Sequence, residues 1–356
     1  MKEGVELEET NQEIQGKKDK NGWIKTILKV LVSLVFLFLI FFRINFKALW
    51  ALINPVTSAL GVPVITSKQN LGEIFLNVSK MDYRYIPFIL LFIVLNYVVG
   101  AFRWKQLLIH EKSKDIPVKY LINLYFIGSF FNNFMPTSIG GDVFKMYQLG
   151  KKLEDKALGI SSTFMERFTG MIALVLVSYI GLIFGMSDLI KSLPVAWRAN
   201  SLYILLFKIL SFGGFWILAI IGFLSLGFLA RKISFFKDIH NAILAYKDNK
   251  KVLLIAFLTS FIVQMFSILT QYFILLSLGI TIPLDYAALI FPVIALAGFF
   301  IPSINSLGVQ EFFYKELLAL RGISNPLALG ASLIYQFARL IISLIGGIFY
   351  ALGKGD

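Results

Sequence analysis

The sequence predicts an all-α polytopic membrane protein with about six full transmembrane helices and two re-entrant hairpins of broken helices. Three observations predict this class. Hydrophobic residues make up 57% of the 356 residues and charged residues 15%, whereas about a quarter of the residues in a soluble domain are charged. The apolar residues also lie in runs long enough to cross a bilayer, which takes roughly 20 residues. Finally, two shorter apolar runs are interrupted by proline and glycine.

The loops that join the predicted spans alternate between strongly basic and weakly basic. The spans are 24–42, 86–109, 158–185, 202–229, 252–278 and 326–352. Basic residues gather before the first span and after the second and fourth, whereas loop 186–201 carries only Lys191 and Arg198. Because basic loops stay in the cytoplasm, we expect a cytoplasmic N-terminus. We expect residues 1–22 to be a disordered cytoplasmic tail and residues 23–353 to form one transmembrane domain.

Several connecting segments have predicted places at the membrane surface. Residues 43–85 are expected to form the longest loop, and residues 233–246 a short amphipathic helix. Arg103 and Trp104 follow the second span, where an arginine extends toward the headgroups and an indole lies among them. Lys145 belongs to a positive cluster that also predicts a cytoplasmic loop.

Two broken segments have similar sequences and indicate an internal repeat. Residues 134–142 read FMPTSIGGD, and residues 300–311 read FIPSINSLGVQE. Downstream of them, ALGIS at 157–161 is matched by ALGAS at 328–332. The repeat divides the chain into halves of roughly 86–185 and 252–352. Repeated broken segments of this kind indicate a transport site near the bilayer midplane.

The broken segments also predict two hairpins that enter the membrane from opposite faces, so that the halves form an inverted repeat. Residues 121–149 lie between positive clusters, and residues 287–320 lie on the opposite side in the alternation. Irregular backbone at membrane depth is tolerated where it is buried in protein or lines a wet cavity. We therefore expect the two hairpin tips to line a polar cavity. The candidate residues are Asn132, Asn133, Thr137, Ser138, Asp142, Ser303, Asn305, Ser306, Gln310 and Glu311. The alternative is that Pro and Gly kink packed helices while Asp142 or Glu311 caps the next helix.

Charged residues also lie deep inside two of the predicted apolar spans, namely Glu166, Arg167 and Arg339. A charge at this depth is costly, so it normally faces the protein interior and marks a functional path or an ion pair. In the functional interpretation the two arginines bind a lipid phosphate. In the structural alternative Glu166 or Asp142 pairs with Arg167, and Glu311 pairs with Arg339.

The same motifs resemble a known family, the flippase-like membrane domain of bacterial lysylphosphatidylglycerol synthases. The resemblance rests on the break at 136–142, the motif at 302–311 and Gly-Ile-Ser at 322–324 followed by Ala328, and it covers about residues 24–352. In the family the second motif commonly reads Pro-Gly-Gly-x-Gly-x-x-Glu, and here serine and asparagine replace most of its glycines.

The resemblance implies translocation of a phospholipid or another lipid-linked anionic head group between leaflets. It implies no aminoacyl transfer, because that activity resides in a separate soluble domain. The 356 residues contain no such domain, so we expect a stand-alone member without aminoacyltransferase activity.

The leading hypothesis is therefore a lipid transporter in the plasma membrane of a prokaryote. Under this hypothesis we expect the protein to have no catalytic residue, no cofactor and no metal, and to bind an anionic phospholipid or a polyprenyl-linked substrate. The protein could also associate with further copies of itself or with a separately encoded synthase. The net charge of +13 is explained by membrane topology, so no nucleic acid is expected. The alternatives are an integral-membrane enzyme, with Asp142, Glu166 or Glu311 as acid or base, and a non-catalytic accessory partner of an enzyme.

Overall fold

A computed structural model describes residues 68–109, 113–133, 140–192, 201–202, 204–205, 246, 249–300, 306 and 308–355. Within these residues the regular structure is helical. The chain is an all-α polytopic membrane protein, as its sequence predicts. The predicted tail, the span 24–42, nearly all of the span 202–229 and the amphipathic segment 233–246 (except Tyr246) lie outside the described residues.

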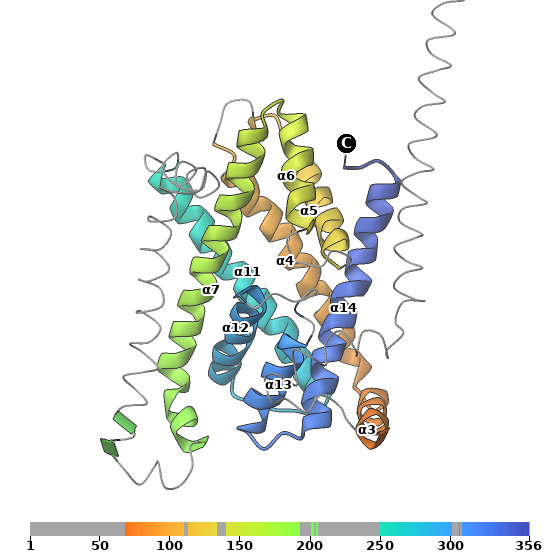
Figure 1. Cartoon of the computed structure of the whole chain (residues 1–356), viewed down its shortest axis with the longest axis vertical. Coiled ribbons are helices and arrows are strands. Elements are labelled where there is room, and N and C mark those ends of the chain that lie inside the picture. Colours follow the sequence, from red (N-terminus) through yellow and green to blue (C-terminus); the bar gives the residue numbers. More distant parts are fainter. Residues whose placement is uncertain are drawn as a thin grey trace, which may run out of the picture.

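The described chain is a bundle of long and short helices (Figure 1). In order they are α3 (Lys68–Ser79), the 3-10 turn η1 (Tyr83–Tyr85), α4 (Ile86–Gln106), α5 (Val118–Asn132), α6 (Gly140–Lys152), α7 (Lys156–Ser192), α11 (Lys250–Ser277), α12 (Leu284–Phe300), α13 (Val309–Ala319) and α14 (Asn325–Ala351). Among the described residues, four helices are long and apolar enough to cross a membrane: α4 together with η1, α7, α11 and α14. They confirm four of the predicted spans.

Two predicted loops contain helical residues. Residues 43–85 were expected to be a loop, yet α3 and η1 lie within them. α3 packs against α14 and buries Ile74 to 3% exposure, so a contact with a distant segment stabilises a helix whose sequence is not strongly apolar. Helix α7 also continues to Ser192, beyond the predicted boundary at 185.

Helices of each predicted half pack against helices of the other half. Helix α4 packs along α11, which begins the second half. Helix α5 packs against α14, while α12 packs against α7. The first short helix of each half therefore contacts the long helix that ends the other half. Figure 1 shows the α5–α6 pair near the upper end of the bundle and the α12–α13 pair near the lower end.

Glycines allow backbone contact at two of these interfaces between the halves. Gly181 of α7 faces α12, and a Cβ there would lie 2.6 Å from the Leu289 backbone. Gly346 of α14 faces α5, and a Cβ there would overlap the carbonyl oxygen of Phe126. Small residues let membrane helices approach at backbone distance. The two interfaces are therefore built by the same kind of contact.

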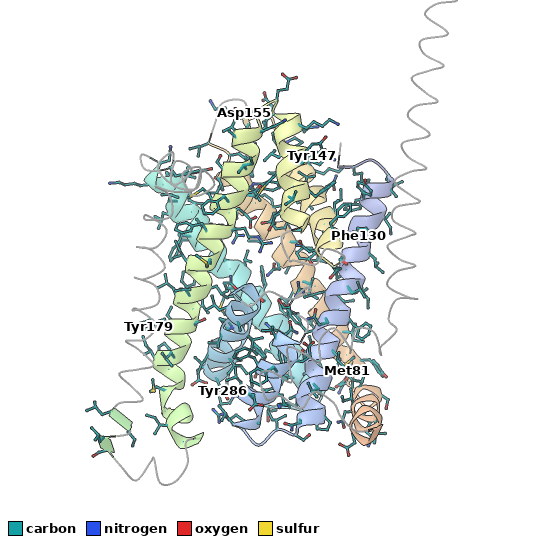
Figure 2. All side chains as sticks on the ribbon, viewed as in Figure 1. Met81, Phe130, Tyr147, Asp155, Tyr179 and Tyr286 are labelled. Atoms are coloured by element: carbon teal, nitrogen blue, oxygen red, sulfur yellow. The ribbon has the colours of Figure 1, made fainter. Side chains whose placement is uncertain are left out.

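Large apolar side chains divide between the bundle interior and its outer surface. Phe130 and Tyr286 are each 1% exposed and lie toward opposite ends of the bundle, whereas Tyr147 is 65% exposed (Figure 2). Exposed apolar side chains also occur along the spanning helices, as at Phe184 and Ile348. Such an outer surface suits acyl chains, because lipid imposes no cost on exposed hydrocarbon.

Candidate functional site

A polar cavity of about 350 Å³ lies between helices of both halves. Its walls are formed by α4, α5, α6 and α7 of the first predicted half and by α11 and α14 of the second. Uncharged polar groups line it at Asn96, Tyr97, Tyr125, Ser129, Asn132, Gln264, Ser267, Thr270 and Tyr335. Charged groups line it at Arg103, Asp142, Lys145, Glu166, Arg167 and Arg339. Polar and charged side chains thus line much of the cavity, although the helices around it other than α6 are strongly apolar.

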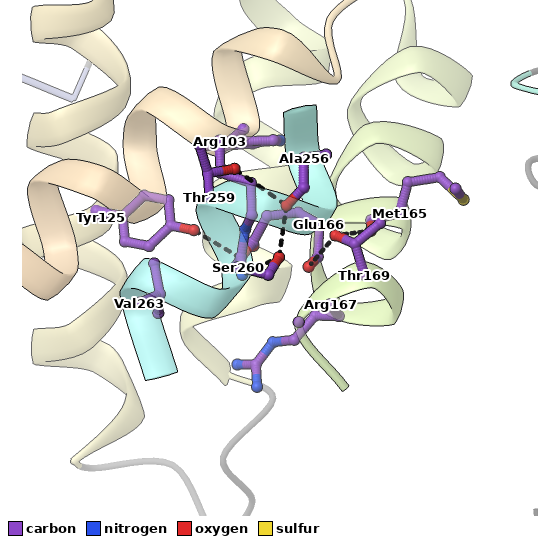
Figure 3. A network of polar contacts seen from close by, with 12 residues as sticks. Arg103, Tyr125, Met165, Glu166, Arg167, Thr169, Ala256, Thr259, Ser260 and Val263 are labelled. Carbon is purple, nitrogen blue, oxygen red and sulfur yellow. Dashed lines mark hydrogen bonds and ion pairs between the residues drawn. The ribbon is translucent and has the colours of Figure 1, made fainter. Parts of the chain in front are cut away.

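Glu166 of α7 is the centre of a buried ion-pair network (Figure 3). One carboxylate oxygen, Oε1, pairs with the Arg103 guanidinium and accepts a hydrogen bond of 2.6 Å from the Tyr125 hydroxyl. The other, Oε2, lies 3.1 Å from Nζ of Lys145. Arg103 also donates to Oγ of Ser260 on α11 at 3.0 Å. The network joins five helices, α4, α5, α6, α7 and α11, and each charge offsets the cost of burying its opposite.

Lys145 extends this network to a second carboxylate. Its Nζ lies 3.0 Å from Oδ1 of Asp142, besides its contact with Glu166. The ammonium also lies 4.3 Å from the centroid of the Tyr125 ring and 5.2 Å from that of Trp104, where the negative ring faces attract a cation. Lys145 is therefore held by two acids and two rings.

Arg167 ends the network at the cavity. Its guanidinium pairs with Oδ2 of Asp142. The Arg167 side chain is nevertheless 37% exposed, whereas those of Asp142, Lys145 and Glu166 are 5–7% exposed. Solvent in the cavity therefore reaches Arg167 while the rest of the network is enclosed. Arg339 reaches the same cavity from α14, with its guanidinium 5.4 Å from the centroid of the Tyr335 ring.

The structure brings together some of the predicted site residues. Asn132, Asp142, Glu166, Arg167 and Arg339 line one cavity. The pairing of Asp142 with Arg167 matches the structural alternative for that arginine. Glu166, in contrast, pairs with Arg103 and Lys145.

Other predicted site residues stabilise helix contacts away from the cavity. Asn133 donates to Oγ of Ser343 at 2.6 Å and so joins the end of α5 to α14. Glu311 accepts a hydrogen bond of 2.6 Å from the Gly308 amide, which caps α13 as the alternative interpretation expected.

The remaining predicted residues include two that also serve packing. Gln310 is buried and donates to Oγ of Ser332 on α14 at 3.1 Å. Ser306 donates to the Gly298 carbonyl at 3.3 Å. Among the described residues, none from α12 or α13 lines the cavity. Thr137, Ser138, Ser303 and Asn305 lie outside the described residues.

Sequence reasoning missed Arg103 and Lys145. Arg103 was expected to extend to the headgroups, but it is 5% exposed and lies in the network. The adjacent Trp104, expected at the same interface, is fully buried and donates to Oγ of Ser162 at 3.3 Å. Lys145 was assigned to a cytoplasmic loop, but it is buried in α6. Glu166 was the residue from which these two cations could have been predicted. Adjacent residues on an α-helix project about 100° apart around its axis, so Arg167 is poorly placed to pair with Glu166. A carboxylate inside an apolar span therefore needs another cation as its partner.

Comparison with known proteins identifies the family. Residues 26–347 match the family described as lysylphosphatidylglycerol synthase TM region. No curated protein and no solved structure matched the chain. The family match spans every described residue that lines the cavity. The chain belongs to the lysylphosphatidylglycerol synthase transmembrane-region family.

Proposed function

We propose that the protein moves an anionic phospholipid or another lipid-linked polar head group between the leaflets of a prokaryotic plasma membrane. The observation that supports this most is the position of Arg167 and Arg339, which come from different halves and line one polar cavity. A guanidinium binds phosphate oxygens with two parallel hydrogen bonds. A family whose description concerns lipid synthesis is consistent with such a ligand.

The ion pairs suggest how phosphate reaches Arg167. Asp142 shares its carboxylate between Arg167 and Lys145. When phosphate binds Arg167, Asp142 keeps Lys145 as a partner and is not left as a lone buried charge. The exchange therefore avoids the large cost of burying an unpaired carboxylate. The acyl chains stay in the lipid outside the bundle while the head group occupies the cavity.

The movement that we propose is a rocking of one half against the other. Its support is the reciprocal packing of α5 on α14 and α12 on α7, together with the repeated motifs. In this proposal the halves form an inverted repeat, the two short-helix pairs are re-entrant hairpins, and the N-terminus is cytoplasmic. Transporters built from inverted repeats expose a central site alternately by such motions.

Transfer assays in proteoliposomes test the proposal. The wild type is expected to move fluorescent phosphatidylglycerol faster than a zwitterionic lipid. Arg167→Gln and Arg339→Gln are each expected to slow the anionic lipid about tenfold or more, because each removes a charged hydrogen-bond donor to phosphate. Glutamine retains a polar side chain, and Asp142 retains Lys145 in the first variant.

Arg84→Gln is the matched control, because the Arg84 side chain is 90% exposed outside the cavity. It should transfer lipid at the wild-type rate. Each variant must also unfold at the wild-type temperature for its rate to be compared. The proposal is wrong if the wild type moves neither lipid, or if both folded cavity variants move the anionic lipid normally.

A further inference from the structure

The charges that line the cavity do not cancel. Among the described residues that line the cavity, four side chains are cationic and two are carboxylates. The cations are Arg103, Lys145, Arg167 and Arg339, and the carboxylates are Asp142 and Glu166. Two positive charges are therefore in excess among the residues that line the cavity. Compensating such an excess in a site with low dielectric constant favours a ligand of opposite charge.

The two carboxylates are already engaged within the protein. Glu166 is held by Arg103, Lys145 and the Tyr125 hydroxyl. Asp142 is held between Lys145 and Arg167. Both carboxylates lie on α6 and α7, whereas the described lining residues of α11 and α14 include Arg339 and no acid. The three cations and two carboxylates of the network therefore leave one positive charge in excess, and Arg339 of α14 adds the second.

The volume of the cavity suits a small ligand group. Its volume of about 350 Å³ lies near the lower end of the range for ligand pockets, about 300–1,000 Å³. A single small head group fits this volume. Hydroxyl and amide groups such as Ser129, Ser267 and Gln264 supply hydrogen bonds to a polar group of that size.

From charge and size together, we infer that the ligand is a lipid whose small head group carries two negative charges on phosphate, as a phosphate monoester does. The inference rests on the proposed function and narrows its substrate class. A phosphate monoester has a second pKa of about 6, so at pH 8 it is a dianion. It brings one more charge than a phosphodiester such as phosphatidylglycerol, and this charge offsets the second cation.

Binding and transfer are measured separately at pH 8. Short-chain phosphatidic acid and short-chain phosphatidylglycerol, both below their micelle concentrations, are titrated onto the purified full chain. We expect phosphatidic acid to bind about tenfold more tightly, since it satisfies one more charged hydrogen bond. Glycerol 3-phosphate carries the same dianion without acyl chains, and weak binding of it is expected because the acyl chains contribute through the surrounding lipid. Fluorescent forms of both lipids are then compared for transfer in proteoliposomes.

Two variants reduce the excess charge from two to one by different routes. Arg339→Gln removes a cation, and Gln264→Glu adds a carboxylate of nearly equal size on α11. In both, the preference for phosphatidic acid should fall to about equal binding of the two lipids. Because the second variant keeps both arginines, it tests the charge count even if the first does not fold. Lys151→Gln makes the same charge change at an exposed position outside the cavity and should keep the wild-type preference.

The outcomes separate this inference from the proposed function. Preferential binding of phosphatidic acid without transfer supports the inference and contradicts lipid transfer. Transfer of both lipids with equal binding supports the proposed function and overturns the inference. Equal binding of glycerol 3-phosphate and phosphatidic acid would also overturn it, because the site would then recognise free phosphate compounds. Preference for phosphatidic acid that survives in a folded Gln264→Glu variant would contradict the charge count.

Discussion

Glu166→Gln is expected to lower the free energy of unfolding by about 3–5 kcal/mol, the usual effect of removing one partner from a buried ion pair. The glutamine amide is close in shape to the carboxylate but carries no charge. Arg103, 5% exposed, would then lose its ion-pair partner, and Lys145 would keep Asp142 but lose the other of its two acidic partners. Thermal unfolding of the purified protein in detergent, followed by circular dichroism, measures the effect.

Two further variants test whether the effect comes from leaving a buried charge without its partner. Glu316→Gln removes an acid that is 49% exposed and pairs with Lys315, and it should change stability by less than about 1 kcal/mol. Arg103→Met combined with Glu166→Met removes both charges of one buried pair and leaves Lys145 with Asp142. This double variant should be more stable than Glu166→Gln, since replacing a buried pair by apolar residues is often neutral. A Glu166→Gln protein as stable as the wild type would contradict the assigned network.

Gly346→Ala is expected to destabilise the protein by about 1–3 kcal/mol. Two effects oppose each other here. Alanine favours a helix by about 1 kcal/mol over glycine, but its Cβ would overlap the Phe126 carbonyl oxygen. Backbone cannot rotate away as a side chain can, so α14 and α5 must separate. The steric cost therefore exceeds the gain in helix propensity.

Gly330→Ala is the control within the same helix. A Cβ at Gly330 would meet only a side-chain carbon of Val78 at 3.8 Å, which is ordinary contact. This variant should be as stable as the wild type or up to about 1 kcal/mol more stable. If the two alanine variants unfold at the same temperature, the close contact between α5 and α14 is not present as described.

The spanning helices could be predicted because length and hydropathy alone define them. The runs at 86–109 and 326–352 are long and apolar, and α4 and α14 follow them closely. In contrast, α3 has no such signal, because it depends on packing against α14. Contacts between segments distant in sequence are not encoded in the composition of one segment.

The cavity could be predicted only in part. Arg167 and Arg339 were identifiable because a charge inside an apolar span is costly and needs a reason. Arg103 and Lys145 lie near the ends of apolar runs, where basic residues commonly serve topology, so sequence alone could not distinguish a buried cation from a surface one. Gln310 and Glu311 belong to a conspicuous motif, yet they hold α13 to Gly308 and Ser332. A motif of Pro, Gly and polar residues encodes a broken helix without saying which side chains face a cavity.

Blocking the cavity tests its role in transport most directly. The chain contains no cysteine, so a single introduced cysteine is the only site for a thiol reagent. Met171 lines the cavity, whereas Met265 on α11 is 41% exposed and lies outside it. Met171→Cys and Met265→Cys are each reconstituted, treated with a bulky water-soluble thiol reagent, and assayed for transfer of an anionic lipid. We predict that the reagent stops transfer by the labelled Met171→Cys protein and leaves transfer by the Met265→Cys protein unchanged. Undiminished transfer by fully labelled Met171→Cys protein would show that the head group does not pass through this cavity.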